Sequence, residues 1–279
     1  MPMTIDEIID QALREDLGDG DHTSLATVPE GSVSKARLLV KQSGVLCGVD
    51  IARRIFNRID PSLEFNALLS DGQRIHPGDV AFTLRGNPVS ILSGERLALN
   101  FMQRLSGIAT QTRRIVDAIE GYPVKLLDTR KTTPLLRELE KYAVKIGGGH
   151  NHRFGLFDMI LIKDNHVDFA GGIVKAIRAV QRYLAEKKLD LKIEIEVRNF
   201  QELEEVLAEG GVHRIMLDNF NPALLRQAIE LIAHRYETEA SGGITLDNIR
   251  EYAATGVDYI SVGALTHQIQ SLDLSLKAY

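Results

Sequence analysis

Charged and polar side chains stand at the ends of several short aliphatic runs in the second half of the chain. The run 125–127 leads into Asp128 and Thr129, and the run 159–162 leads into Lys163. Later runs end in the same way, on Glu196, on Asp218, on residues 241–243 and on residues 262–264. If these runs are parallel strands, their ends emerge on one face, where side chains converge on a ligand. The pattern therefore predicts an active-site mouth.

The segment 128–166 is basic within an acidic protein. The whole chain carries 33 Lys and Arg against 38 Asp and Glu, a net charge of −5, whereas this segment is net +2. A compact basic region favours a small anionic ligand over nucleic acid. Guanidinium groups suit carboxylates and phosphates because they donate two parallel hydrogen bonds. We expect four cations to bind this ligand and three to form a solvated helix face, respectively Arg130, Lys131, Arg153 and Lys163, and Arg137, Lys141 and Lys145.

Two carboxylates oppose this basic cluster. Glu196 and Asp218, at the ends of their strands, could hold Mg²⁺ or accept hydrogen bonds from sugar hydroxyls. Strand alternation places Glu194 on the same face as Glu196, where it could be an ion-pair partner inside a barrel. The histidines at 150, 152 and 166 lack a cysteine or a clear fourth ligand, so zinc is disfavoured.

Glycines follow the last two expected strands. Ser241, Gly242 and Gly243 form the first of these turns, and Val262, Gly263 and Ala264 form the second. Backbone N–H groups there, with helix N-termini behind them, could cradle a phosphate, although two ordinary strand-to-helix turns are the alternative. Gly147–Gly149 is not a Walker loop, and the chain has no GxGxxG motif.

Alternating strands and helices must position these residues. After residue 120 we expect strands at 125–129, 159–162, 192–197, 214–218, 238–240 and 258–263, and helices at 134–145, 171–186, 200–209, 221–235 and 245–255. This alternation predicts a parallel sheet. About six strands suit an open barrel, a barrel completed by further strands, or a doubly wound sheet as the second choice. Pro134 and Pro222 are candidate first residues of helices, after caps at Thr133 and Asn221.

The first third of the chain has a mixed pattern. Thr4 and Glu7 form a capping box for a helix that stops near Gly18. Strand-like runs at 36–40 and 80–84 flank a short helix near 49–57. A long helical pattern then runs from 91 to 119, with Gly107 as a candidate break or bend.

Composition limits the class of protein. A chain with 44% hydrophobic and 25% charged residues can build an ordinary core. No apolar stretch approaches the roughly 18 residues of a membrane span. The single cysteine, Cys47, cannot form an internal disulfide, and the acidic start does not resemble a signal peptide. We expect a cytoplasmic protein without membrane or nucleic-acid partners.

The long central block is family-specific. The run DTRKTTPLLRELEKYAVKIGGGHNHRFGLFDMILIKDNH (128–166) closely resembles the signature of the quinolinate phosphoribosyltransferases. Further segments resemble that family in order, at 15–24, 93–110, 194–197, 215–220, 239–245 and 260–267. The resemblance implies an N-terminal α/β sandwich-like domain (1–112), an incomplete, open α/β barrel (113–270) and a C-terminal tail (271–279) that packs back on the first domain.

The resemblance also implies an activity and a set of site residues. Members convert quinolinate and phosphoribosyl pyrophosphate to nicotinate mononucleotide, pyrophosphate and CO₂ with Mg²⁺, in NAD synthesis. They form homodimers or dimer-based hexamers, in which the residue matching Arg96 enters the partner's site. By this resemblance Lys163, Glu196 and Asp218 are catalytic, and Glu196 and Asp218 face the metal. Quinolinate binds Arg96, Thr129, Arg130, Lys131, His152, Arg153 and Lys163, and the 5′-phosphate binds residues 241–243 and 262–264.

Two other functions stay open at this point. A related phosphoribosyltransferase could use nicotinate or another pyridine carboxylate, but a monoacid needs fewer cations than this chain offers. A nucleotide-sensing barrel without activity could lose Lys163, Glu196 or Asp218 and keep its fold, yet this chain retains all three.

Overall fold

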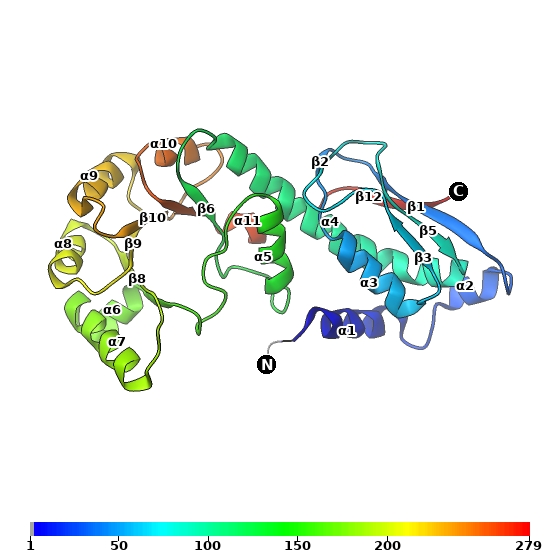
Figure 1. Ribbon diagram of the computed structural model, residues 1–279, viewed down its shortest axis with the longest axis horizontal. Coiled ribbons are helices and arrows are strands. Elements are labelled where there is room, and N and C mark those ends of the chain that lie inside the picture. The colour runs from blue at the N-terminus through cyan, green and yellow to red at the C-terminus, as the bar shows by residue number, and fades with distance from the viewer. Residues whose placement is uncertain (1–2) are drawn as a thin grey trace. The chain divides into compact units, whose positions relative to one another are not determined.

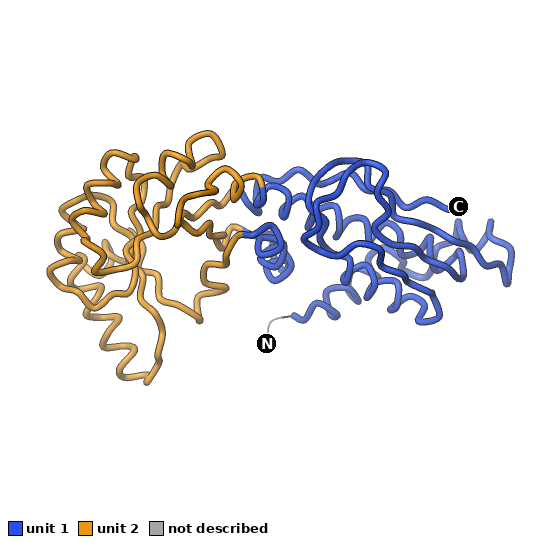
Figure 2. Tube along the Cα trace, turned by 45° about the horizontal axis from the view of Figure 1, so that its top comes forward, with its two compact units in different colours: residues 1–113, 132–148, 265–279 blue, residues 114–131, 149–264 orange. Residues whose placement is uncertain are grey.

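The computed structural model describes residues 3–279, and the chain forms two compact units (Figure 2). Unit 1 comprises the chain up to Arg113 together with 132–148 and 265–279. Unit 2 comprises 114–131 and 149–264. Each unit therefore contains segments that are distant in sequence.

Unit 1 is built on an antiparallel four-stranded sheet, in the order β12-β1-β5-β3. These strands are β1 (Ser34–Val40), β3 (Glu64–Ala67), β5 (Val80–Gly86) and β12 (Leu274–Ala278), and β2 (Gly44–Val45) pairs with β4 (Arg74–Ile75). Its helices are α1 (Ile5–Leu17), α2 (His22–Thr27), α3 (Val49–Ile59), most of α4 (Pro88–Ala118), α5 (Arg137–Ile146) and most of α11 (Ala264–His267). The half-buried ring of Phe65 stacks on the buried ring of Phe82 at 4.5 Å between centroids. Apolar burial of this kind supplies most of the stability of a small unit.

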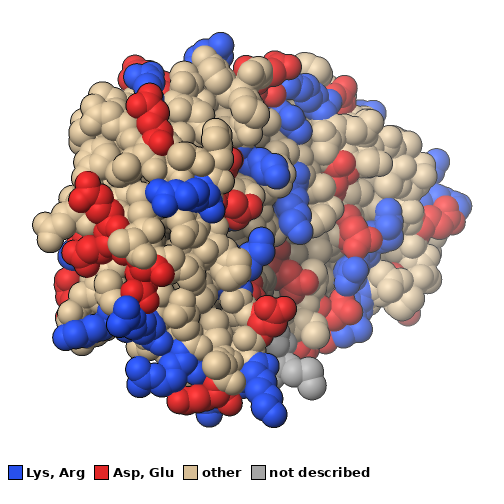
Figure 3. Space-filling view, turned by 60° about the vertical axis from the view of Figure 1, so that its left-hand side comes forward, with Lys and Arg blue, Asp and Glu red and all other residues tan. Residues whose placement is uncertain are grey.

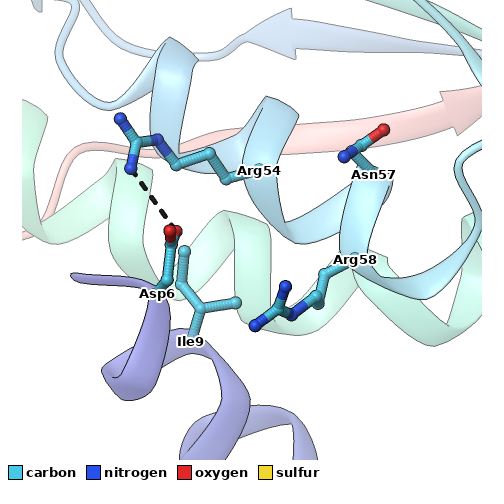
Figure 4. A pocket seen from close by; sticks show the side chains of 5 residues that line it. All are labelled: Asp6, Ile9, Arg54, Asn57 and Arg58. Carbon is cyan, nitrogen blue, oxygen red and sulfur yellow. Dashed lines mark hydrogen bonds and ion pairs between the residues drawn. The ribbon is translucent and has the colours of Figure 1, made fainter. Parts of the chain in front are cut away.

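The first helix begins as its sequence predicts. The Glu7 N–H donates to Thr4 Oγ1 at 3.2 Å, and the Thr4 N–H donates to Glu7 Oε2 at 2.7 Å, so the capping box is confirmed. Figure 4 shows α1 against α3, with Arg54 directed at Asp6 and Ile9 between the helices. The Arg54–Asp6 distance is 3.4 Å across an exposed pair, so buried Ile9 contributes more to this contact than the charges do.

Helix α4 runs without interruption through Gly107, so the expected break there is wrong. A side chain at Gly107 would collide with the backbone carbonyl of Gln270 in the C-terminal segment of the same unit. The glycine thus permits a close approach of two backbones and does not end the helix.

Unit 2 is a six-stranded, all-parallel sheet in the order β6-β11-β10-β9-β8-β7. Its strands are β6 (Lys125–Leu127), β7 (Ile160–Ile162), β8 (Ile193–Val197), β9 (Arg214–Asp218), β10 (Glu237–Ser241) and β11 (Tyr259–Ser261). From β7 to β11 chain neighbours are sheet neighbours, and the first strand, β6, lies beside the last, β11. This is barrel order, whereas a doubly wound sheet reverses direction at a switch point.

The barrel is open between β6 and β7, as expected from the resemblance. Among the described residues these two strands share no ladder, and an isolated bridge from Leu127 to His150 lies on the free side of β6. Helices cover the outer side of the sheet (Figure 1), namely α6 (Asp164–Ala170), α7 (Ile173–Lys187), α8 (Phe200–Glu209), α9 (Pro222–Ile232) and α10 (Ile249–Ala253). The carboxyl ends of all six strands consequently share one edge of the barrel.

The two proline-based helix starts have different outcomes. Helix α9 starts at Pro222, and Asn221 Oδ1 accepts the N–H groups of Ala223 and Leu224, so that prediction is confirmed. Helix α5 starts at Arg137, so Pro134 is not its first residue. Leu135 has a φ of +67°, which turns the chain before the helix can begin.

Surface charge and hydropathy agree with the composition. Basic and acidic side chains are interspersed over the face shown in Figure 3, without a continuous stripe of one sign. Within residues 3–279, no helix combines the length and the apolar character that a membrane crossing requires.

Candidate active site

Lys163, Glu196 and Asp218 meet at the carboxyl edge of the unit 2 barrel. Lys163 follows β7, Glu196 is the next-to-last residue of β8, and Asp218 ends β9; these three strands are adjacent. Lys163 Nζ lies 3.1 Å from Glu196 Oε2, and its own backbone N–H donates to His166 Nδ1 at 2.9 Å to cap α6. The edge therefore combines one ammonium group with two carboxylates.

Burial and charge both act on these carboxylates. Burial raises the pKa of Glu196 and that of Asp218, and the positive charge of Lys163 opposes both shifts. Lys131 also lowers the pKa of Asp218, which places a second cation within electrostatic reach. Partly buried carboxylates beside cations suit a ligand in which positive and negative charge develop together.

A second group of cations follows β6 and the bridge at His150. Thr129 Oγ1 accepts the Lys131 N–H at 3.1 Å and so shapes the turn that carries Arg130. Burial and the charge of Arg130 both lower the pKa of Arg153. Two guanidinium groups repel at this range, and an anion between them would relieve the repulsion.

Backbone contacts hold the Arg153 loop in place. The His152 N–H donates to the buried Asp128 Oδ1 at 2.8 Å, and Arg153 Nη1 donates to the Met159 carbonyl at 3.2 Å. Asp158 accepts the N–H of Gly155 at 2.8 Å. These contacts pre-organise the cations before a ligand binds.

His152 belongs to a charged cluster inside the barrel, which we name the core cluster: His152, Glu194, Arg214 and Glu239. His152 Nε2 lies 2.9 Å from Glu194 and 3.5 Å from Glu239, and Arg214 Nη1 lies 3.1 Å from Glu239. Both glutamates are fully buried, at 0% exposure. Buried carboxylates are tolerated only when partners of opposite charge surround them. Glu194 is thus buried beside His152 inside the barrel, where an ion-pair role was expected.

The core cluster holds one extra proton. Burial lowers the pKa of His152, but the contacts and charges of Glu194 and Glu239 outweigh it and raise the pKa to about 9. Burial and the charge of Glu239 raise the pKa of Glu194 to about 7. The Arg153 N–H donates to His152 Nδ1 at 2.7 Å, so Nε2 faces Glu194, and the two side chains share the extra proton across this contact. Arg214 and ionised Glu239 then leave the cluster neutral.

This proton predicts a pH-dependent stability. The pKa of His152 is raised in the folded chain, so its contribution is complete below the ordinary value and is lost as pH rises through about 9. We expect the Tm difference between wild type and His152→Gln to shrink from pH 6.5 to pH 9.5, roughly the range between the two pKa values.

The measurement is a thermal scan at each pH. His76→Gln, at a 74% exposed position, controls for the loss of a histidine as such. A Tm difference for His152→Gln that stays constant across the range would contradict the shared proton.

The glycine turns lie at the ends of β10 and β11. Gly242 and Gly243 have φ values of +93° and +63°, which favour glycine. Helix α10 begins only at Ile249, so the expected helix N-terminus does not lie directly behind the first turn, whereas α11 begins at Ala264 within the second turn. The Val262 N–H already donates to the Leu127 carbonyl at 3.0 Å, which fixes the second turn to β6.

Unit 2 contains all the predicted site residues except Arg96, which is exposed on the part of α4 in unit 1. Sequence reasoning missed Arg214, Asn219 and Glu239. The signal for Glu239 was its even spacing from Glu237 in a short strand, which places both on one face.

The fold and the site together define an α/β enzyme with a charged centre at the carboxyl edge of an open parallel barrel. Family models for quinolinate phosphoribosyl transferase match the chain, the N-terminal domain at residues 21–106 and the C-terminal domain at 108–277.

Curated relatives and solved structures agree with these matches. The chain is 45% identical to quinolinate phosphoribosyltransferase [decarboxylating] 2b, mitochondrial, of Nicotiana tabacum, over 97% of this chain and 81% of the relative. It is 41% identical to the probable nicotinate-nucleotide pyrophosphorylase [carboxylating] of Bacillus subtilis, over 98% and 93%. The crystal structure of NadC from Streptococcus pyogenes aligns at a TM-score of 0.93 and 41% identity, over 99% and 96%. The chain belongs to the quinolinate phosphoribosyl transferase family.

Proposed function

We propose that this protein transfers the phosphoribosyl group of phosphoribosyl pyrophosphate to quinolinate with loss of CO₂, as a step of NAD synthesis. The names of its relatives in tobacco and Bacillus support this activity. The observation that carries it is the meeting of Lys163 with Glu196 and Asp218 on the strand edge that also bears the Arg130 and Arg153 cations.

The cations are proposed to hold the two carboxylates of quinolinate. Arg130 and Arg153 lie within electrostatic reach of each other, so a dianion is the ligand that best relieves their repulsion. Thr129, Lys131 and His152 line the same pocket in this proposal. His152 would help to orient the residues of this pocket, because its Nε2 points into the core cluster.

The carboxylates are proposed to stabilise the sugar in the transition state. Breaking the bond between C1′ and pyrophosphate builds positive charge on the ribose and negative charge on the leaving group. Glu196 and Asp218 would face the former, and Lys163 would face the latter. No side-chain nucleophile is needed, because the pyridine nitrogen of quinolinate itself attacks C1′.

Mg²⁺ fits this donor set. Hard oxygen ligands on neighbouring strands are what Mg²⁺ binds through one or two carboxylates together with substrate phosphates. Glu196 and Asp218 would hold the ion, which would supply positive charge for the departing pyrophosphate.

Decarboxylation follows from the product of the transfer. Once the ring nitrogen bonds to C1′ it is cationic, and it can accept the electron pair left on C2 when the adjacent carboxylate leaves as CO₂. C2 then takes up a proton to give nicotinate mononucleotide. The fixed Arg153 loop would hold the ring in the geometry that both steps require.

The 5′-phosphate is proposed to bind the two glycine turns. The first turn, Ser241–Gly243, lies at the end of β10, and the second, Val262–Ala264, lies at the end of β11 and is anchored by the Val262 N–H bond to Leu127. Both turns lie on the same edge as Asp218, since β9, β10 and β11 are adjacent. A 5′-phosphate bound at these turns would place C1′ of the ribose near the carboxylates of Glu196 and Asp218.

The working form is proposed to be a homodimer, alone or within a hexamer, in which Arg96 enters the partner's site. Arg96→Ala should lower kcat/KM by about 10- to 100-fold, since a charge-assisted hydrogen bond contributes about 1.5–3 kcal/mol. A hybrid of one Arg96→Ala and one Lys163→Ala subunit should recover about half of the wild-type activity, because one of its two sites is intact.

The hybrid is isolated with two different affinity tags and is assayed beside both parent dimers. A hybrid as inactive as its parents would argue against a shared site.

The cellular location stays a prediction: we expect the cytoplasm, whereas the name of the tobacco relative contains "mitochondrial".

The substrate assignment is tested with competing acceptors. Quinolinate, nicotinate and other pyridine carboxylates are supplied separately with phosphoribosyl pyrophosphate and Mg²⁺, and pyrophosphate release is measured. We expect quinolinate to have the highest kcat/KM. A preference for nicotinate would overturn the assignment.

A further inference from the structure

Asn219 has an unusual backbone conformation at the carboxyl edge of the barrel. It directly follows Asp218 at the end of β9 and has a φ of +57°, in the left-handed region. Asparagine enters this region more readily than most side chains, because its amide can bond locally. Its N–H donates to the Ser241 carbonyl at 2.8 Å, so the chain turns against the end of β10.

The side chain of Asn219 contacts two parts of the proposed site. Its Nδ2 donates to Asp218 Oδ2 at 2.6 Å. Its Oδ1 lies against Gly242, so closely that a Cβ on Gly242 would overlap it. Gly242 is therefore glycine for two reasons, its positive φ of +93° and this contact.

We propose that Asn219 is a positioning residue that ties the Asp218 carboxylate to the Ser241–Gly243 turn. The inference rests on the proposed function, in which Asp218 faces the ribose and the turn holds the 5′-phosphate. The ribose and the 5′-phosphate are covalently linked and lie at a nearly fixed separation. Asp218 and the Ser241–Gly243 turn, which would bind them, must therefore also keep a fixed separation.

The amide acts on Asp218 by restricting its rotation. A donor on Oδ2 fixes the plane of the carboxylate and leaves the lone pairs of Oδ1 for ribose hydroxyls or a metal ion. Partners of this kind, one step removed from the ligand, typically change affinity or activity by about 10- to 100-fold when they are lost.

Three variants separate this role from folding. Asn219→Gly removes the amide and accepts the positive φ without strain. Asn219→Asp keeps the shape but replaces the donor with a second carboxylate beside Asp218. Asn221→Asp is the matched control, because it adds the same charge two residues away and aspartate caps α9 as well as asparagine does.

We expect both Asn219 variants to raise the KM and the calorimetric Kd for phosphoribosyl pyrophosphate by about 10-fold or more, and to lower kcat. The KM for quinolinate should change less than about twofold, because none of the cations proposed to bind it follows β9 or β10. The Tm of Asn219→Gly should stay near that of the wild type, and Asn221→Asp should resemble the wild type in every measurement.

A double variant tests whether Asn219 acts through Asp218. If it does, Asp218→Asn with Asn219→Gly should bind phosphoribosyl pyrophosphate no more weakly than Asp218→Asn alone. Fully additive losses would contradict the inference, as would Asn219 variants with wild-type Kd and kinetics while Asp218→Asn is impaired. If Asp218→Asn instead had the Kd and kinetics of the wild type, the proposed function of the site itself would be contradicted.

Discussion

Lys163→Met is expected to lower kcat by about 100- to 1,000-fold while the chain stays folded, the usual cost of removing one group that stabilises transition-state charge. Lys163 Nζ is the cation 3.1 Å from Glu196 Oε2, and its charge lowers the pKa of both Glu196 and Asp218. Without it the leaving pyrophosphate loses a positive partner, and both carboxylates become harder to keep ionised. The side chain is 47% exposed, so its loss removes little buried surface.

Steady-state kinetics and a thermal scan measure these two effects. Lys175→Met, at an exposed position of α7 outside the site, is the matched control and should retain wild-type kcat. A normal turnover number for Lys163→Met would remove this residue from the reaction.

Glu239→Gln is expected to lower the free energy of unfolding by about 3–5 kcal/mol, the range found when one partner of a buried ion pair is removed. Glu239 is fully buried between His152 and Arg214. The substitution leaves the positive charge of Arg214 without its buried counter-charge. Rearrangement of the neighbouring side chains cannot admit water to the Arg214 guanidinium without a large free-energy cost, because the barrel interior is closely packed.

The control for this prediction shares the same arginine. Arg214 Nη2 also lies 3.1 Å from Glu237, whose side chain is 39% exposed. Glu237→Gln should cost no more than about 1 kcal/mol, as exposed pairs do. Urea denaturation of both variants gives the comparison, and equal losses would contradict the special role of the buried pair.

The sequence alone predicted the elements whose signals are local. Alternating aliphatic runs located all six strands of the barrel, and Thr4 with Glu7 located the first helix start. The charge pattern located Lys163 and Glu196, because strand ends of parallel sheets share one edge.

Features that depend on distant contacts could not be predicted in this way. Gly107 has the sequence signature of a helix break, but its reason is the passage of residue 270, which no local pattern encodes. Pro134 has the signature of a helix start, yet the left-handed turn at Leu135 delays the helix. Glu239 and Arg214 become partners of His152 only when the strands are brought side by side.

The amount of CO₂ released per pyrophosphate tests the central claim most directly. Quinolinate labelled in its 2-carboxylate is incubated with the protein, phosphoribosyl pyrophosphate and Mg²⁺, and both products are counted over the same interval. Cations that hold a dianionic pyridine beside an activated sugar predict labelled CO₂ and pyrophosphate in equal amounts, with nicotinate mononucleotide as the nucleotide product. Pyrophosphate formed without labelled CO₂, or no reaction with quinolinate at all, would contradict this account.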